Sequence, residues 1–229
     1  MPDFRLSAVA LLLLCSALSA QDQQDSNSTS SNLSDLLANA PPIIRVEEDW
    51  EILVAEPDSA NDSPQIVTVF GPTDATWGTH AVFELNHGTL PDFGEGGMQL
   101  QAWYQNQQVG YKGQFAPAEL EIAGEIVRFT TVTRLSNFNL ILEIRNGQSA
   151  TWGSFGDTSF LRLRLLTIRT DLNPYDPDNS LRHSRVTFGA NRVNRFVRKE
   201  IRFFDSEGLY AADSTPRYVH RLAADAIPD

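Results

Sequence analysis

The chain has 229 residues with 29 acidic and 18 basic side chains, and its formal net charge of −11 at pH 7 argues against a nucleic-acid-binding protein. Hydrophobic residues make up 41% of the chain, which is enough for one sizeable core, so a very small or disordered protein is excluded. The single cysteine, Cys15, lies near the N-terminus, so we expect a fold without disulfides.

The first twenty residues have the pattern of a secretory signal peptide. Arg5 precedes an apolar run over residues 6–14, and mostly small residues follow up to Ala20. Nine apolar residues are too few to span a bilayer, so we expect cleavage near Ala20 and no transmembrane span in the mature chain. The expected location is secreted, periplasmic or at the cell surface. A lipid anchor on Cys15 is the alternative, but a leucine stands before it where such sites have a small residue.

Residues 21–42 are rich in Ser, Asn, Gln and Asp and predict a flexible polar leader. From residue 43 onward, short runs alternate between apolar and polar side chains, which is typical of strands in antiparallel sheets with one solvated face. The clearest runs are residues 66–70, 83–85, 98–102, 138–144 and 161–165.

These runs predict an all-β fold, an antiparallel two-sheet sandwich of jelly-roll or concanavalin-like type. After Leu165 the alternation changes phase, and we expect a β-bulge there. The predicted domain covers residues 43–210, and residues 211–229 are expected to form a C-terminal tail.

Three carboxylates, Glu47, Asp49 and Glu51, alternate along one predicted strand and would share one face at steps of about 7 Å. This E-x-D-x-E pattern resembles the catalytic strand of laminarinase-type glycoside hydrolases. The resemblance implies a concanavalin-like sandwich with a nucleophile, a helper acid and a general acid on that strand. The alternative interpretation is a solvated strand face without catalysis.

Basic side chains concentrate late in the chain, where residues 160–203 hold 10 bases and 4 acids. Trp77 and Trp152 occupy similar sequences, Ala-Thr-Trp-Gly followed by Thr or Ser. One hypothesis is that the two rings stack on sugars while arginines hold the anionic groups of an acidic polysaccharide or envelope component. The alternative is that the tryptophans are buried and the arginines pair with acidic strands. The candidate arginines are Arg192, Arg195 and Arg198.

An Asp- and Asn-rich stretch over residues 171–180 offers several oxygen ligands of the kind that calcium prefers, so calcium is the one cofactor considered. Ordinary turn formation beside proline is the alternative. The candidate ligands are Asp171, Asn173, Asp176 and Asp178.

Residues 186–193 with 201–205 resemble the last strands of laminin-G and concanavalin-like lectin domains. Residues 45–51 with 56–58 resemble the opening of secreted proteins from planctomycete bacteria, which implies a bacterial origin and export but no particular activity. We therefore expect an exported, non-enzymatic β-sandwich that binds glycan or cell-envelope material. The alternatives are a concanavalin-like glycoside hydrolase and a structural subunit of a surface assembly.

Overall fold

A computed structural model describes residues 33, 35–37, 39–56, 64–72, 78–86, 96–115 and 118–222, although not the side chains of residues 114 and 115. The predicted signal peptide and most of the leader lie outside these residues. The chain divides into two compact units, residues 1–39 and residues 40–229. In the first unit, residues 33 and 35–37 are helical, and the Asn39 amide donates a hydrogen bond to the Asp35 carbonyl at 3.3 Å.

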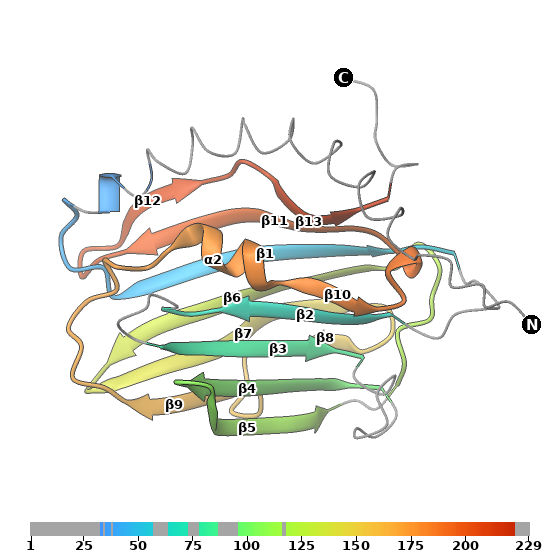
Figure 1. Ribbon diagram of the computed structural model, residues 1–229, viewed down its shortest axis with the longest axis horizontal. Coiled ribbons are helices and arrows are strands. Elements are labelled where there is room, and N and C mark those ends of the chain that lie inside the picture. Colours follow the sequence, from blue (N-terminus) through green and yellow to red (C-terminus); the bar gives the residue numbers. More distant parts are fainter. Residues whose placement is uncertain are drawn as a thin grey trace, which may run out of the picture. The chain divides into compact units, whose positions relative to one another are not determined.

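The second unit contains an antiparallel sheet of eight strands in the order β12-β11-β1-β6-β7-β8. Strand β13 pairs with β11 beside β12, and β9 pairs with β7 beside β8 (Figure 1). The strands are β1 (Arg45–Val54), β6 (Ile126–Ser136), β7 (Asn139–Ser149), β8 (Gly153–Phe155), β9 (Arg162–Leu166), β11 (Val193–Phe204), β12 (Leu209–Asp213) and β13 (Arg217–Arg221).

A second antiparallel sheet has five strands in the order β10-β2-β3-β4-β5. Figure 1 shows it in front of β6 and β7, with helix α2 (Pro177–His183) beside it, in front of β1. Its strands are β2 (Gln65–Phe70), β3 (Thr79–Leu85), β4 (Met98–Tyr104), β5 (Gln107–Phe115) and β10 (Arg185–Phe188), and a short 3₁₀ helix, η2 (Ala190–Arg192), leads into β11.

The core lies between the two sheets and follows from the alternation of apolar side chains. Phe83 of β3 packs edge-on against Phe129 of β6, with ring centroids 5.1 Å apart, and Phe155 of β8 extends this aromatic cluster. Trp50 of β1 packs against Phe196 of β11 at 5.3 Å. These side chains come from both sheets, and the predicted all-β, antiparallel two-sheet sandwich is confirmed.

Two local predictions are wrong. The change of phase after Leu165 is not a bulge, because β9 pairs with β7 in continuous register and ends at Leu166. Residues 211–213 and 217–221 are not a tail, because they belong to β12 and β13 and pair with β11. Residues 223–229 lie outside the described part of the chain.

The two-residue turn between β6 and β7 contains an aromatic residue in an unusual backbone conformation. Its two residues, Asn137 and Phe138, both have positive φ, at 48° and 61°. Gly and Asn are the usual residues at such positions, because Gly has no Cβ to crowd the following carbonyl and the short Asn side chain can hydrogen-bond locally, whereas an aromatic residue is rare. Phe138 is nevertheless 81% exposed, so burial does not compensate for its backbone conformation.

Candidate functional sites

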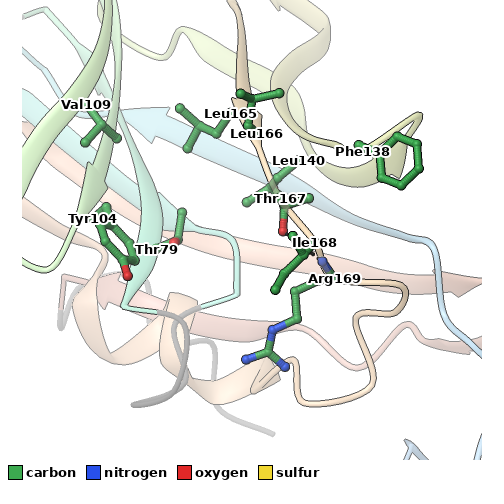
Figure 2. A pocket seen from close by; sticks show the side chains of 10 residues that line it. All are labelled: Thr79, Tyr104, Val109, Phe138, Leu140, Leu165, Leu166, Thr167, Ile168 and Arg169. Atoms are coloured by element: carbon green, nitrogen blue, oxygen red, sulfur yellow. Dashed lines mark hydrogen bonds between the residues drawn. The ribbon is translucent and has the colours of Figure 1, made fainter.

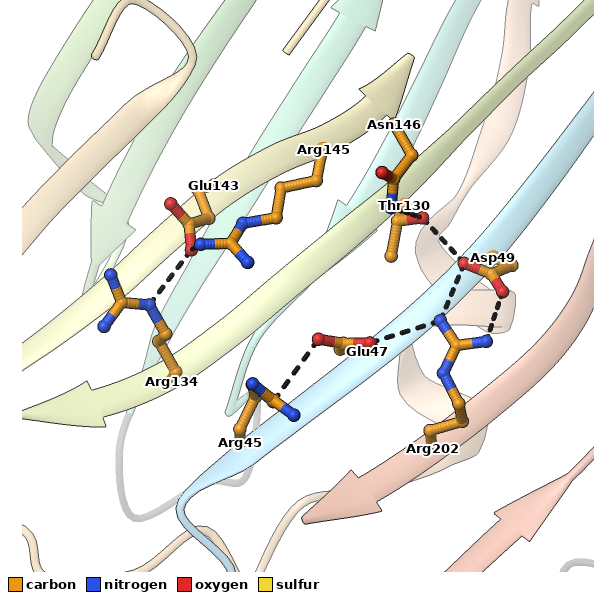
Figure 3. A network of polar contacts seen from close by, with 9 residues as sticks. All are labelled: Arg45, Glu47, Asp49, Thr130, Arg134, Glu143, Arg145, Asn146 and Arg202. Carbon is orange, nitrogen blue, oxygen red and sulfur yellow. Dashed lines mark hydrogen bonds and ion pairs between the residues drawn. The ribbon is translucent and has the colours of Figure 1, made fainter. Parts of the chain in front are cut away.

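The outward face of the eight-stranded sheet is rich in arginine. Its strands point nine arginines and five carboxylates outward, an excess of four positive charges in a protein of net charge −11. We call this surface the arginine face, and Figure 3 shows its central part. The arginines are Arg45, Arg128, Arg134, Arg145, Arg162, Arg164, Arg195, Arg202 and Arg221, and the carboxylates are Glu47, Asp49, Glu51, Glu143 and Glu200.

Glu143 of β7 anchors one end of this face. It pairs with Arg134 and Arg145, each at 3.0 Å, and with Arg162 of β9. Burial acts to raise the pKa of Glu143, but the hydrogen bonds of Arg134 and Arg162 and the charge of Arg145 outweigh it, so the pKa lies below its ordinary value. One carboxylate therefore holds three guanidinium groups in place.

The three carboxylates of the hydrolase-like pattern also lie on this face. Glu47 pairs with Arg45 at 3.3 Å and Arg202 at 3.2 Å, and Asp49 holds Arg202 through two contacts of 2.5 and 3.1 Å (Figure 3). Their positions along β1 therefore match the predicted shared face. Glu47 and Asp49 each form ion pairs with arginine, and they lie on the outward surface of the sheet.

Glu51 continues this row. It pairs with Arg128 of β6 and Arg195 of β11, each at 2.9 Å. Burial opposes the ionised form, but the two arginines prevail and lower the pKa of Glu51. A general acid needs a raised pKa, so the surroundings of Glu51 are unsuited to that role.

The three candidate arginines do not share a surface. Arg195 lies on the arginine face, whereas Arg198, three residues later on β11, is 3% exposed and points to the inner side of the sheet. The register of β11 with β1 is continuous between these two residues, and side chains three residues apart on a strand point to opposite faces. Arg192 is buried in η2 and its guanidinium lies 3.5 Å from the Glu121 carbonyl. Of these three arginines, only Arg195 is therefore placed to contact an external ligand on the arginine face.

Arg198 belongs to a buried polar cluster beneath α2. Its guanidinium contacts Glu48 at 3.0 Å and Ser180 at 3.1 Å and also donates to the Pro177 carbonyl. The Ser180 hydroxyl donates to Glu48 at 2.7 Å, and Tyr175 hydrogen-bonds the same carboxylate. Burial raises the pKa of Glu48, and these partners act against that rise. The cluster fastens α2 to β1 and β11.

The candidate calcium ligands are engaged locally. Asp176 caps α2 by accepting from the Asp178 amide at 3.0 Å and also binds Arg182. Asn173 joins its segment to the start of the sandwich by accepting from the Ile43 amide at 2.9 Å, and Asp171 accepts from the Asn173 amide. Within the described residues, no three acidic, histidine or cysteine side chains gather to hold a metal ion.

Of the two candidate tryptophans, Trp77 lies outside the described residues. Trp152 is half-buried in the turn between β7 and β8, where its indole donates to the Ala118 carbonyl at 2.8 Å and its ring packs edge-on against Phe155. Its ring is thus held in place by the fold.

An apolar groove of about 680 Å³ opens between the β4–β5 turn and the segment that follows β9 (Figure 2). Figure 2 shows Tyr104 and Val109 on one side and Leu165, Leu166 and Ile168 on the other. The sequence prediction missed this groove because it assigned the apolar side chains of residues 138 and 165–168 to strands. The remaining lining residues are Thr79, Phe138, Leu140, Thr167 and Arg169.

No protein-family model matches the chain, and no curated protein matches its sequence. Among the described residues, no helix has the length and apolar character needed to cross a membrane.

Proposed function

We propose that this chain is an exported, non-enzymatic β-sandwich that binds acidic polysaccharide of the cell envelope through its arginine face. The observation that carries the proposal is the excess of four arginines on one sheet surface of a protein whose net charge is −11. Guanidinium groups bind carboxylate and sulfate groups through paired hydrogen bonds, which suits repeated anionic sugars.

The carboxylates of the face support this function by holding arginines in position. Glu143 orders three of them and Glu51 orders two, so less side-chain entropy is lost when a ligand binds. Arg164 forms no ion pair with a described carboxylate, and Arg128 keeps 56% of its side chain exposed, so both can contact a ligand directly. Glycoside hydrolysis has less support, because the hydrolase-like carboxylates pair with arginines on an open surface.

The full chain should bind alginate, a polymer of uronic acids, with an affinity that falls at least tenfold between 50 and 200 mM NaCl, because exposed charges are screened within about 8 Å at physiological ionic strength. The double variant Arg128→Ala/Arg164→Ala should bind at least threefold more weakly while it remains folded at the temperature of the titration. Isothermal titration calorimetry gives the affinities.

The matched control is Arg182→Ala, which removes an exposed arginine of α2 that lies off the arginine face. It should bind alginate as the parent does. Neutral dextran binding as strongly as alginate, or an unchanged affinity in the double variant, would refute the proposal.

A further inference from the structure

Three large apolar side chains protrude at one corner of the sandwich. Phe138, Leu166 and Ile168 are 81%, 89% and 95% exposed, and we call them the apolar corner. They are neighbours, because Leu166 pairs with Asn139 and the Thr167 amide donates to the Phe138 carbonyl at 2.9 Å. Scattered exposed apolar residues are ordinary, but a contiguous group beside an apolar groove marks an interaction surface.

Phe138 gives a second reason to assign a role to this corner. Its positive φ is a conformation in which glycine or asparagine is more stable than an aromatic residue. A strained backbone that carries an exposed ring is a feature that functional sites retain.

Basic side chains lie immediately beside the apolar corner. Arg164 lies two residues before Leu166 on the same outward face of β9, and Arg169 follows Ile168 and lines the groove (Figure 2). The corner is thus continuous with the arginine face. The apolar side chains of the corner could insert among acyl chains, and the guanidinium groups beside them could bind anionic headgroups. This combination suits the surface of a lipid membrane that contains anionic lipids.

We propose that the apolar corner docks this protein on a lipid membrane surface of net negative charge, with Phe138, Leu166 and Ile168 inserted among the acyl chains. The net charge of −11 does not prevent this contact, because charges more than about 8 Å from the surface are screened at physiological ionic strength. A symmetric dimer through the same corner is disfavoured because it would bring Arg164 close to its own copy.

The experiment is sedimentation of the full chain with vesicles of phosphatidylcholine alone or with 30% phosphatidylglycerol. Every version carries Leu11→Glu and Leu13→Glu, so that the apolar run of residues 6–14 does not bind lipid itself. The parent should sediment with the anionic vesicles and at least fivefold less with the neutral ones. The variant Phe138→Gly/Leu166→Ser/Ile168→Ser should bind at least tenfold more weakly while its alginate binding is unchanged.

The matched control is Ile122→Ser/Leu209→Ser, which removes two exposed apolar side chains outside the apolar corner and should bind vesicles as the parent does. The single variant Phe138→Gly should bind vesicles more weakly at an equal or higher melting temperature, which separates lost binding from lost folding. Equal sedimentation of parent and triple variant, or of the two vesicle types, would overturn the proposal. So would a parent dimer, seen by light scattering, that the triple variant converts to a monomer.

Discussion

Replacing Arg198 with methionine is expected to cost about 3–5 kcal/mol of unfolding free energy at pH 8, because it leaves the buried carboxylate of Glu48 without its countercharge. Glu48 is 1% exposed and Arg198 3%, so water cannot replace the lost partner. Urea denaturation followed by tryptophan fluorescence gives the free energy, and the loss should be smaller at pH 5, where Glu48 can take up a proton.

Arg195→Met is the matched control, because Arg195 lies on the same strand but pairs with Glu51 at the surface. Its cost should be clearly smaller than that of Arg198→Met, because Glu51 keeps Arg128 as a second partner. The double variant Glu48→Gln/Arg198→Met should recover at least half of the loss, since the uncharged amide can still hydrogen-bond Ser180. Equal costs for Arg195→Met and Arg198→Met would show that the buried pair is no more important than the surface pair.

The sandwich could be predicted because alternating side chains mark which face of a strand is buried. Leu140, Leu142 and Ile144 of β7 all point into the core, as their spacing indicates. The two C-terminal strands could not be predicted in this way. Residues 209–213 and 217–221 are short and largely polar or exposed, and they exist as strands because they pair with β11. The start of helix α2 could have been predicted from the sequence, since Asp at the N-cap followed by Pro at the first helical position, here Asp176 and Pro177, is typical of a helix N-terminus.

The candidate sites depended on facts that local sequence does not contain. Five arginines of the arginine face lie outside residues 160–203, and only the pairing of β1, β6, β7, β9, β11 and β13 brings their side chains together with the others. The pairing irregularity between Arg198 and Glu200 brings Arg202 to the same face as Arg195. Arg195 and Arg198 are three residues apart, so strand alternation places them on opposite faces. The expectation that late arginines pair with acidic strands is confirmed for both, through Glu51 and Glu48.

Replacing Glu84 with glutamine is expected to stabilise the protein above neutral pH. Glu84 lies on β3, where burial raises its pKa to about 7 even though the positive charge of Arg185 acts in the opposite direction. Gln99 of the neighbouring strand donates a hydrogen bond to the carboxyl group. A glutamine side chain has the same shape and can still accept this bond, so the substitution removes only the ionisation.

The sign of the effect follows from the direction of the shift. Because the folded pKa of about 7 exceeds the ordinary value of 4.5, the stability due to the protonated group is fully present below about pH 4.5 and is lost as pH rises through 7. A difference of this size corresponds to at most roughly 3 kcal/mol. The unfolding free energies of parent and Glu84→Gln should therefore agree near pH 4.5 and diverge by about 2–3 kcal/mol in favour of the variant at pH 8.5.

Glu143→Gln is the control of opposite sign. Three arginines lower the pKa of Glu143, so this carboxylate stabilises the protein above its ordinary pKa and loses that contribution as pH falls. The variant should therefore be less stable than the parent at pH 8.5, and the deficit should shrink in acid. Urea titrations of the three proteins from pH 4 to 9 test both signs together. A Glu84→Gln protein whose stability tracks that of the parent across this range would show that Glu84 titrates as an ordinary exposed carboxyl.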